Sequence, residues 1–306
     1  MYPFRQTRIR PNLVRRARII DGVRAFFGSA GFLEIETPVR IPAPLPEAHI
    51  DAQPSGAWFL QPSPELTMKR LLAAGYERIF QICRCFRRDE RGDRHLPEMT
   101  LLEWYVADAD YRLLMQQCEQ LIVFLARRLT MGSHLKVRGH SIDLTPPWER
   151  LSVADAFERL GGMTVEDACE RNCFDEVMGL AIEPRLGLDR PVFLCDYPAR
   201  CGSLARLKPG NPSVVERFEL YIAGLELCNA FSELADPMEQ RTRFEAENRI
   251  RKDHGRIVYP MAEPFLQALA HMPAAAGIAL GIDRLVMLLT DADAIDDVVA
   301  FTPEEL

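Results

Sequence analysis

Several patterns that would place this chain in a common class of protein are missing from it. No apolar run in the 306 residues approaches the roughly 20 residues needed to span a bilayer. The eight cysteines include no C-x2-C pair, so a structural zinc site is not expected. The N-terminal segment has no apolar core of the kind that secretory signals carry. We therefore expect a cytoplasmic protein with reduced thiols and no association with membranes.

A surplus of positive charge is also missing. Lys and Arg number 37 against 44 Asp and Glu, which gives a formal net charge of −7. Neutralising nucleic-acid phosphates requires an excess of cations, so general nucleic-acid binding is disfavoured. Neither a P-loop pattern nor a protein-kinase catalytic-loop pattern occurs, so a nucleotide would have to be bound by other means.

One local exception to the acidic balance lies near the N-terminus. Residues 1–24 carry a single acid, Asp21, and seven arginines: Arg5, Arg8, Arg10, Arg15, Arg16, Arg18 and Arg24. Two interpretations are open. The arginines form either the solvated start of a first helix or a docking patch for an acidic partner.

The apolar periodicity predicts separate helices and long strands. Helices are expected over residues 12–30, 64–75, 112–129 and 238–254. The first has Asn12 as its N-cap and Gly31 as its stop, and Pro64 lies in the first turn of the second. Strands are expected over residues 32–42, 77–86, 99–107, 192–197 and within 214–231. Residues 275–290 are expected to form a strand, a turn at Gly281 and a helix.

This order of elements predicts an α+β fold with an antiparallel sheet flanked by helices. We expect a single domain over residues 1–306. Residues 87–98 are expected to form a charged loop between two strands. Residues 131–190 are predicted to be a peripheral helical insertion without an assigned function.

Polar residues gather at three places within this otherwise apolar framework. At the first, Arg87 follows a predicted strand and begins the charged loop, a pattern that by itself fits a solvated hairpin tip. At the second, Gly281 would let the backbone approach a ligand closely. Arg284 then lies in the first turn of an apolar helix, where Asp283 could hold it and a phosphate could be reached.

The third place is a predicted strand region that carries carboxylates at intervals of seven residues. Glu219, Glu226 and Glu233 would be costly to bury unless they are paired or bind a metal. Oxygen ligands of this kind suit Mg²⁺ with a bound polyphosphate. An interval of seven places successive side chains on opposite faces of a strand unless a bulge intervenes. An edge strand with one wet face is therefore the alternative.

In this order and spacing, the segments resemble the class II aminoacyl-tRNA synthetases, specifically the lysyl type. GFLEIETP at 31–38, FRRDERGDRHLPEMTLLEWY at 86–105 and GIALGIDRLVMLL at 277–289 are similar to the three motifs of that family. SPELTMKRL at 63–71 and ELCNAFSEL at 226–234 resemble segments of its lysine pocket. The resemblance implies a homodimer formed through the first motif, where Phe32 and Ile35 would be exposed if left unpaired.

Within that family, the chain is similar to the truncated bacterial ligases that attach (R)-β-lysine to a lysine of elongation factor P. The first motif begins too early to leave room for an anticodon-binding domain, so no such domain and no stable tRNA binding are expected. Ser63 stands where lysyl-tRNA synthetases usually have Ala, and Ala279 stands where they usually have Gly. Alternatives are a minimal tRNA-charging enzyme, an amino-acid ligase, or a non-catalytic pseudo-synthetase.

The resemblance also implies a reaction and a set of site residues. The cofactors would be ATP and Mg²⁺, and lysine or (R)-β-lysine would be activated as an adenylate. Phosphate charge would be stabilised by Arg87 and Arg284. The metal would be bound by Glu219 and Glu226. ATP would be contacted by Arg87, Arg88, Asp89, Leu96, Glu226, Leu227, Gly281 and Arg284. The amino acid would be contacted by Ser63, Pro64, Glu65, Glu103, Tyr105, Asn229, Glu233 and Ala279.

Two of these places depart from the family pattern. The family usually reads R-N-E where this chain has Arg87, Arg88 and Asp89, and it has Asn where this chain has Leu96. Both departures fall on residues that the resemblance assigns to ATP.

Overall fold

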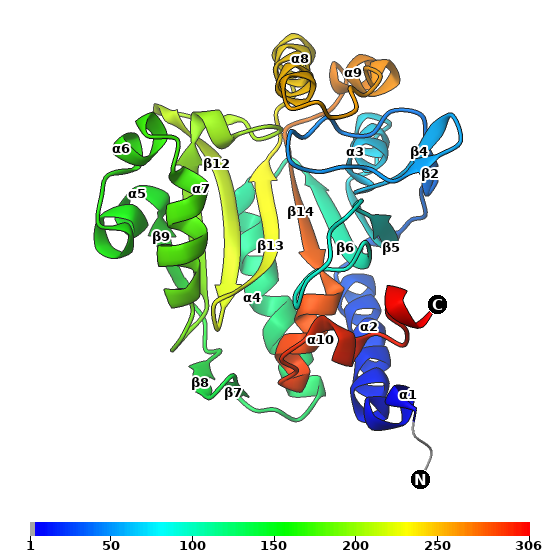
Figure 1. Ribbon diagram of the computed structural model, residues 1–306, viewed down its shortest axis with the longest axis vertical. Coiled ribbons are helices and arrows are strands. Elements are labelled where there is room, and N and C mark those ends of the chain that lie inside the picture. The colour runs from blue at the N-terminus through cyan, green and yellow to red at the C-terminus, as the bar shows by residue number, and fades with distance from the viewer. Residues whose placement is uncertain (1–3) are drawn as a thin grey trace.

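The computed structural model describes residues 4–306 and is built around one large sheet (Figure 1). Its strand order is β1-β5-β6-β14-β13-β12-β10-β9, with β11 paired to β12. All neighbours pair antiparallel except β1 with β5 and β10 with β9. The strands are β1 (Leu33–Glu34), β5 (Arg78–Phe86), β6 (Glu98–Ala107), β9 (Glu149–Ser152), β10 (Val192–Pro198), β11 (Leu207–Lys208), β12 (Asn211–Ile222), β13 (Leu225–Ser232) and β14 (Ala275–Gly281). The predicted α+β fold with a mostly antiparallel sheet is confirmed.

Two small sheets complete the strands. One contains β2 (Arg40–Ile41), β3 (Pro54–Ser55) and β4 (Trp58–Leu60), and the other contains β7 (His134–Val137) and β8 (His140–Asp143). The α-helices are α1 (Arg5–Arg8), α2 (Arg10–Ser29), α3 (Glu65–Ala73), α4 (Tyr111–Arg128), α5 (Val153–Ala156), α6 (Val165–Glu170), α7 (Phe174–Val177), α8 (Pro237–Asp253), α9 (Glu263–Leu269) and α10 (Ile282–Thr290). In the described part of the chain, none of them combines the length and apolar character needed to cross a membrane.

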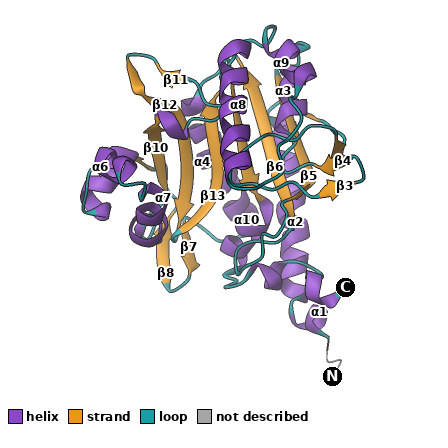
Figure 2. Cartoon of the chain, turned by 45° about the horizontal axis from the view of Figure 1, so that its top comes forward, coloured by secondary structure: helices purple, strands orange, loops and turns teal. Residues whose placement is uncertain are grey.

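The helices divide between two places on the sheet. Helices α2, α4 and α10 share one large apolar core with alternate side chains of the central strands. Helices α3, α8 and α9 lie together near one end of the sheet, toward the top of Figure 1, and Figure 2 shows α8 in front of the strands. The first group therefore closes one face of the sheet, and the second group borders the other face.

Helix α4 shows why these segments adopt this arrangement. Leu114, Cys118, Leu121 and Leu125 recur at helical spacing and are all buried against the sheet. The side chain of Asp110 caps the helix by accepting a hydrogen bond from the Arg112 N–H at 2.9 Å. Each buried leucine contributes about 2 kcal/mol relative to an exposed one, so the apolar stripe fixes this helix on the sheet.

Two predictions about the N-terminal region are wrong, and one is confirmed. Helix α2 begins at Arg10, and Asn12 donates its side-chain N–H to the Asp297 carbonyl at 3.0 Å instead of capping the helix. The strand predicted over 32–42 is reduced to the short β1 and β2, because its prolines cannot donate to a ladder. Gly31 does follow the helix with a φ of +76°, a conformation that favours glycine.

The N-terminal arginines are mostly engaged within the chain. Five of the seven contact other residues: Arg5 (with Glu305), Arg8 (with Asp297), Arg15 (with the Leu289 carbonyl), Arg16 (with Asp283) and Arg24 (with Glu34). A docking patch would need these groups to be available, so the structure does not support that interpretation. The solvated-helix interpretation is also incomplete, because Arg5 and Arg8 pair with Glu305 and Asp297 of the C-terminal segment.

The segment 131–190 is only partly the predicted peripheral helical insertion. It contains helices α5, α6 and α7, but also strands β7, β8 and β9, and β9 extends the main sheet. Phe32, expected to be exposed in a monomer, is only 8% exposed and belongs to the core shared with α2. Its burial removes one of the two residues on which the dimer argument rested.

Candidate functional site

The site lies on the face of the sheet opposite to α2, α4 and α10. Leu102 and Trp104 of β6 point into the helical core, so Glu103 and Tyr105, which alternate with them, point to the other face. Strand register then aligns Glu103 with Ala279 of β14, and Ala279 with Asn229 of β13. These side chains line a cavity of about 740 Å³.

A β-bulge explains the carboxylates at intervals of seven. The chain turns between β12 and β13, and Tyr221 pairs with Glu226 while Leu220 pairs with Cys228. Leu227 is therefore left without a partner and restores Glu226 to the face that carries Asn229. Glu219 pairs directly with Asn229, so carboxylates from both strands reach the same side. The bulge that an interval of seven residues requires, if the carboxylates are to share one face, is therefore present.

Glu103 lies at the centre of the cavity floor and is fully buried. The Ser63 hydroxyl donates to its Oε1 at 2.6 Å, and the Tyr105 hydroxyl donates to its Oε2 at 2.8 Å. Burial, aided by the nearby charge of Glu65, raises the pKa of Glu103 to about 7. A cation placed beside this buried carboxylate would therefore stabilise its ionised form.

Glu233 forms the second half of the same acidic group. Its Oε2 lies 2.5 Å from the Lys69 ammonium, which also binds Glu65. Its Oε1 accepts no hydrogen bond from any residue between 4 and 306. Burial raises the pKa of Glu233 to about 8, although Lys69 opposes the shift. The unpartnered oxygen lies where Gly277 leaves room for it, because a Cβ there would approach Oε1 to 2.4 Å.

The opposite end of the cavity is cationic. Arg284 donates to the carbonyl of Glu226 at 3.1 Å and to its carboxylate at 3.2 Å, and it also contacts Nε2 of His95. Burial and three arginines lower the pKa of His95 to about 4, so the ring is neutral and can accept. Arg87 has an unpartnered Nε within the described chain, and its nearest acid, Glu90, is 3.9 Å away. This end is suited to a polyanion.

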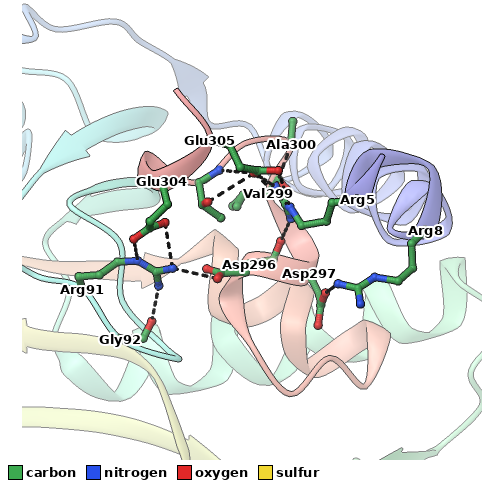
Figure 3. A network of polar contacts seen from close by, with 11 residues as sticks. Arg5, Arg8, Arg91, Gly92, Asp296, Asp297, Val299, Ala300, Glu304 and Glu305 are labelled. Atoms are coloured by element: carbon green, nitrogen blue, oxygen red, sulfur yellow. Dashed lines mark hydrogen bonds and ion pairs between the residues drawn. The ribbon is translucent and has the colours of Figure 1, made fainter. Parts of the chain in front are cut away.

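The loop that carries Arg87 and His95 is anchored through Arg91 (Figure 3). Arg91 pairs with Asp296 at 2.9 Å and with Glu304 at 2.8 Å, so the C-terminal segment holds the middle of the loop. The same segment receives Arg5 through Glu305, which links the two ends of the described chain to the cationic side of the site.

The two predicted metal ligands lie on neighbouring strands in different environments. Both oxygens of Glu219 are occupied, one by Arg217 and the other by the hydroxyls of Tyr197 and Tyr221. Glu226 has its pKa raised by burial and then by Glu219. Among residues 4–306, no group of three or more His, Cys, Asp or Glu side chains is placed to hold a metal alone. The oxygen donors fit Mg²⁺ only if phosphate oxygens complete its coordination.

The structure brings most of the predicted residues to the cavity wall. Those that line it are Ser63, Glu65, Arg87, Leu96, Glu103, Tyr105, Glu226, Leu227, Asn229, Ala279, Gly281 and Arg284. Asp89 instead borders a smaller recess beside Arg87, and Arg88 lies outside both and pairs with Asp89. Pro64 caps α3, Glu233 is enclosed beneath the cavity, and Glu219 is held among its three partners.

One predicted pairing is wrong. Asp283 does not hold Arg284. It pairs with Arg16 at 2.6 Å and accepts the Thr100 N–H at 2.8 Å, because the first turn of α10 directs it toward α2. The Asn229 side chain, predicted to contact the amino acid, lines the cavity and accepts a hydrogen bond from Arg217 at 3.0 Å.

Sequence reasoning missed several residues of the site. Glu47, Arg94, His95, Phe174 and Arg217 all line the cavity. Phe174 comes from the segment to which no function had been assigned. Lys69 gave one usable signal, since it follows Glu65 by four residues on a predicted helix. The five missed residues that line the cavity reach it only through tertiary contacts.

Comparison with known proteins identifies the class to which this fold and site belong. The family model described as tRNA synthetases class II (D, K and N) matches residues 1–305, and the chain belongs to that family. It is 40% identical to a lysine–tRNA ligase of Moorella thermoacetica over 94% of this chain and 64% of that protein. It is 38% identical to an elongation factor P–(R)-β-lysine ligase of Pectobacterium carotovorum over 96% of this chain and 95% of that protein.

A second elongation factor P–(R)-β-lysine ligase, from Salmonella gallinarum, is 36% identical over 95% of each chain. The chain therefore spans less than two thirds of the lysine–tRNA ligase above and nearly the whole length of the two elongation factor P ligases.

Proposed function

We propose that this protein activates lysine or (R)-β-lysine with ATP and transfers it to a lysine side chain of elongation factor P. The observation that carries this proposal is one cavity with buried carboxylates at one end and arginines at the other. The acidic end suits the ammonium groups of a diamino acid, and the cationic end suits the phosphates of a nucleotide.

In the first step, the carboxylate of the amino acid would attack the α-phosphorus of ATP, and pyrophosphate would leave. Arg87, with its unpartnered Nε, would neutralise charge that develops on the α-phosphate. Arg284, already oriented by Glu226 and His95, would bind the terminal phosphate. Mg²⁺ held by Glu226 and Glu219 would supply further charge neutralisation. The protein thus contributes positioning and electrostatics.

The substrate amines would lie at the opposite end. Glu65 and Glu103 would bind the amine nearer the carboxylate, and Glu233 would bind the side-chain ammonium through its free Oε1. Ser63 donates to Glu103 and accepts the Glu65 N–H at 3.0 Å, so it orients both carboxylates of the first amine site. A hydroxyl at position 63 therefore shapes that site directly, as Ala at the same place could not.

Elongation factor P is proposed as the acceptor over tRNA because of the extent of the match. The related ligases named for elongation factor P are covered over 95% of their length. In the second step, the amine of the acceptor lysine would attack the adenylate carbonyl and AMP would leave. An ordinary lysine amine has a pKa near 10.4, so it must lose a proton before it attacks.

We further propose that residues 1–306 form a single catalytic domain, and that the protein acts as a cytoplasmic homodimer. Exposed apolar residues support the dimer, because Leu33 of the first motif and Val39 directly after it are 51% and 40% exposed. Sedimentation at micromolar concentration should show a dimer, and a monomer across that range would contradict this part of the proposal.

The deciding experiment is ATP–pyrophosphate exchange with (R)-β-lysine and α-lysine, followed by addition of elongation factor P or tRNA. Exchange that favours the β isomer, with a mass gain on elongation factor P, is expected. Exchange with α-lysine and charging of tRNA would instead support a tRNA-type enzyme. Loss of exchange with every amino acid would indicate a non-catalytic binding protein.

A further inference from the structure

Lys69 is buried in the centre of the acidic group, although no role in the proposed reaction has been given to it. The residue is 1% exposed, and its ammonium binds Glu65 on the same helix and Glu233 at the end of β13. It also lies 5.0 Å from the centre of the Phe231 ring. Burial opposes the charge on Lys69, but Glu233 and Glu65 outweigh it and raise its pKa, so the ammonium stays charged.

The charges around Lys69 can be counted. Glu65, Glu103 and Glu233 are all buried and carry three negative charges when ionised, and Lys69 carries one positive charge. With all three carboxyls ionised, the group is left with two negative charges. Near pH 7 the raised pKa values of Glu103 and Glu233 keep these two carboxyls partly protonated until a cationic substrate binds. A diamino acid at neutral pH carries two ammonium groups, and its carboxylate would lie toward Arg87. The two charges that Lys69 leaves unmatched equal the two that such a substrate brings.

We propose that Lys69 is a positioning residue that sets the charge of this pocket, so that it is neutralised by a substrate with two ammonium groups. This inference rests on the proposed function and adds to it a residue that makes no contact with substrate. Lys69 occupies Oε2 of Glu233 and leaves Oε1 free beside Gly277. It thereby orients Glu233 as well as compensating its charge.

A purely mechanical role would have a different signature. If the ion pair only joined α3 to the end of β13, removing it would lower stability, and it would lower activity by the same factor at every pH. A residue that sets charge must also move the pH dependence of substrate binding. Removing the cation raises the pKa of the neighbouring carboxyls. The ionised carboxylates bind ammonium groups, so the acidic limb of kcat/KM must shift to higher pH.

The test compares Lys69→Met with Lys252→Met, which alters an exposed lysine of α8. In ATP–pyrophosphate exchange, Lys69→Met should raise the KM for lysine by about 10- to 100-fold, because Glu233 loses the charge-assisted contact that orients it. The variant should also shift the acidic limb of kcat/KM to higher pH. The double variant Lys69→Met with Glu65→Gln restores the charge count and should return the limb toward its original position. Lys252→Met should change neither quantity.

A second measurement uses the unaltered protein and does not depend on the variants folding. Calorimetry of lysine binding at pH 7, in buffers of different ionisation enthalpy, should show release of about one proton, because bound ammonium groups lower the pKa of Glu103 and Glu233. An unchanged limb in folded Lys69→Met, or no proton release, would overturn the inference alone. Failure of the unaltered protein to bind or exchange either lysine isomer would overturn the proposed function as well.

Discussion

Replacing Gly277 with alanine would place a methyl group in the wall between Tyr105 and Glu233. An added Cβ would lie 2.2 Å from Cε1 of Tyr105 and 2.4 Å from Oε1 of Glu233. Carbon atoms in contact are normally about 3.5–4.0 Å apart, so the tyrosine ring would have to retreat by more than about 1 Å. Because β14 lies between two hydrogen-bonded strands, its backbone has little freedom to move instead.

The magnitude follows from this displacement. Overpacking of this kind typically costs about 1–3 kcal/mol of stability. If Tyr105 retreats, its hydroxyl no longer donates to Glu103, and a hydrogen bond to a charged group is worth about 1.5–3 kcal/mol. We therefore expect Gly277→Ala to lower the melting temperature and to raise the KM for lysine by about 10- to 150-fold in the exchange assay, at about 1.4 kcal/mol for each tenfold.

Gly28 offers a matched control. It lies on the exposed side of α2, and a Cβ there would meet nothing within 4 Å. Gly28→Ala should leave the KM unchanged and stabilise the helix by up to about 1 kcal/mol. If Gly277→Ala left both the melting temperature and the KM unchanged, Tyr105 and Glu233 could not pack this closely against Gly277.

Three further outcomes are expected. Arg284→Gln should reduce the exchange rate about 100-fold or more, because the phosphates of ATP lose a guanidinium that neutralises their charge, while the melting temperature stays nearly unchanged. An exchange rate equal to that of the unaltered protein would show that Arg284 does not bind phosphate. Arg91→Gln should raise the KM for ATP, since its pairs with Asp296 and Glu304 hold the loop, and thermal scans should show a loss of under about 1 kcal/mol because the pairs are partly exposed. The raised pKa values of Glu103 and Glu233 mean that the folded state binds more protons than the unfolded state, so the folded protein loses stability as pH rises from about 4.5 to about 8. Lysine should therefore increase the melting temperature more at pH 8.5 than at pH 6, and an equal increase at both would contradict these shifts.

Local pattern was enough to predict the framework of this protein. The strands expected over 77–86 and 99–107 differ from β5 and β6 by one residue at each N-terminal end, since their apolar character and the charged loop between them are local features. The ordered motifs also led to Arg87, Glu103 and Arg284, which line one cavity. The strand predicted over residues 32–42 was wrong for most of its length. Pairing that depends on a distant strand cannot be judged from alternation along the chain alone.

The sequence by itself determined the fold class, the family and a set of site residues most of which line the cavity, because these depend on residue type and on spacing along the chain. Only the tertiary structure decided which face Glu226 occupies, since the bulge at Leu227 is a property of strand register. It alone also placed Lys69 between Glu65 and Glu233, and Arg16 against Asp283. Charges that are far apart in sequence are paired by packing, so the net charge of the pocket could be counted only after the strands and helices had been assembled.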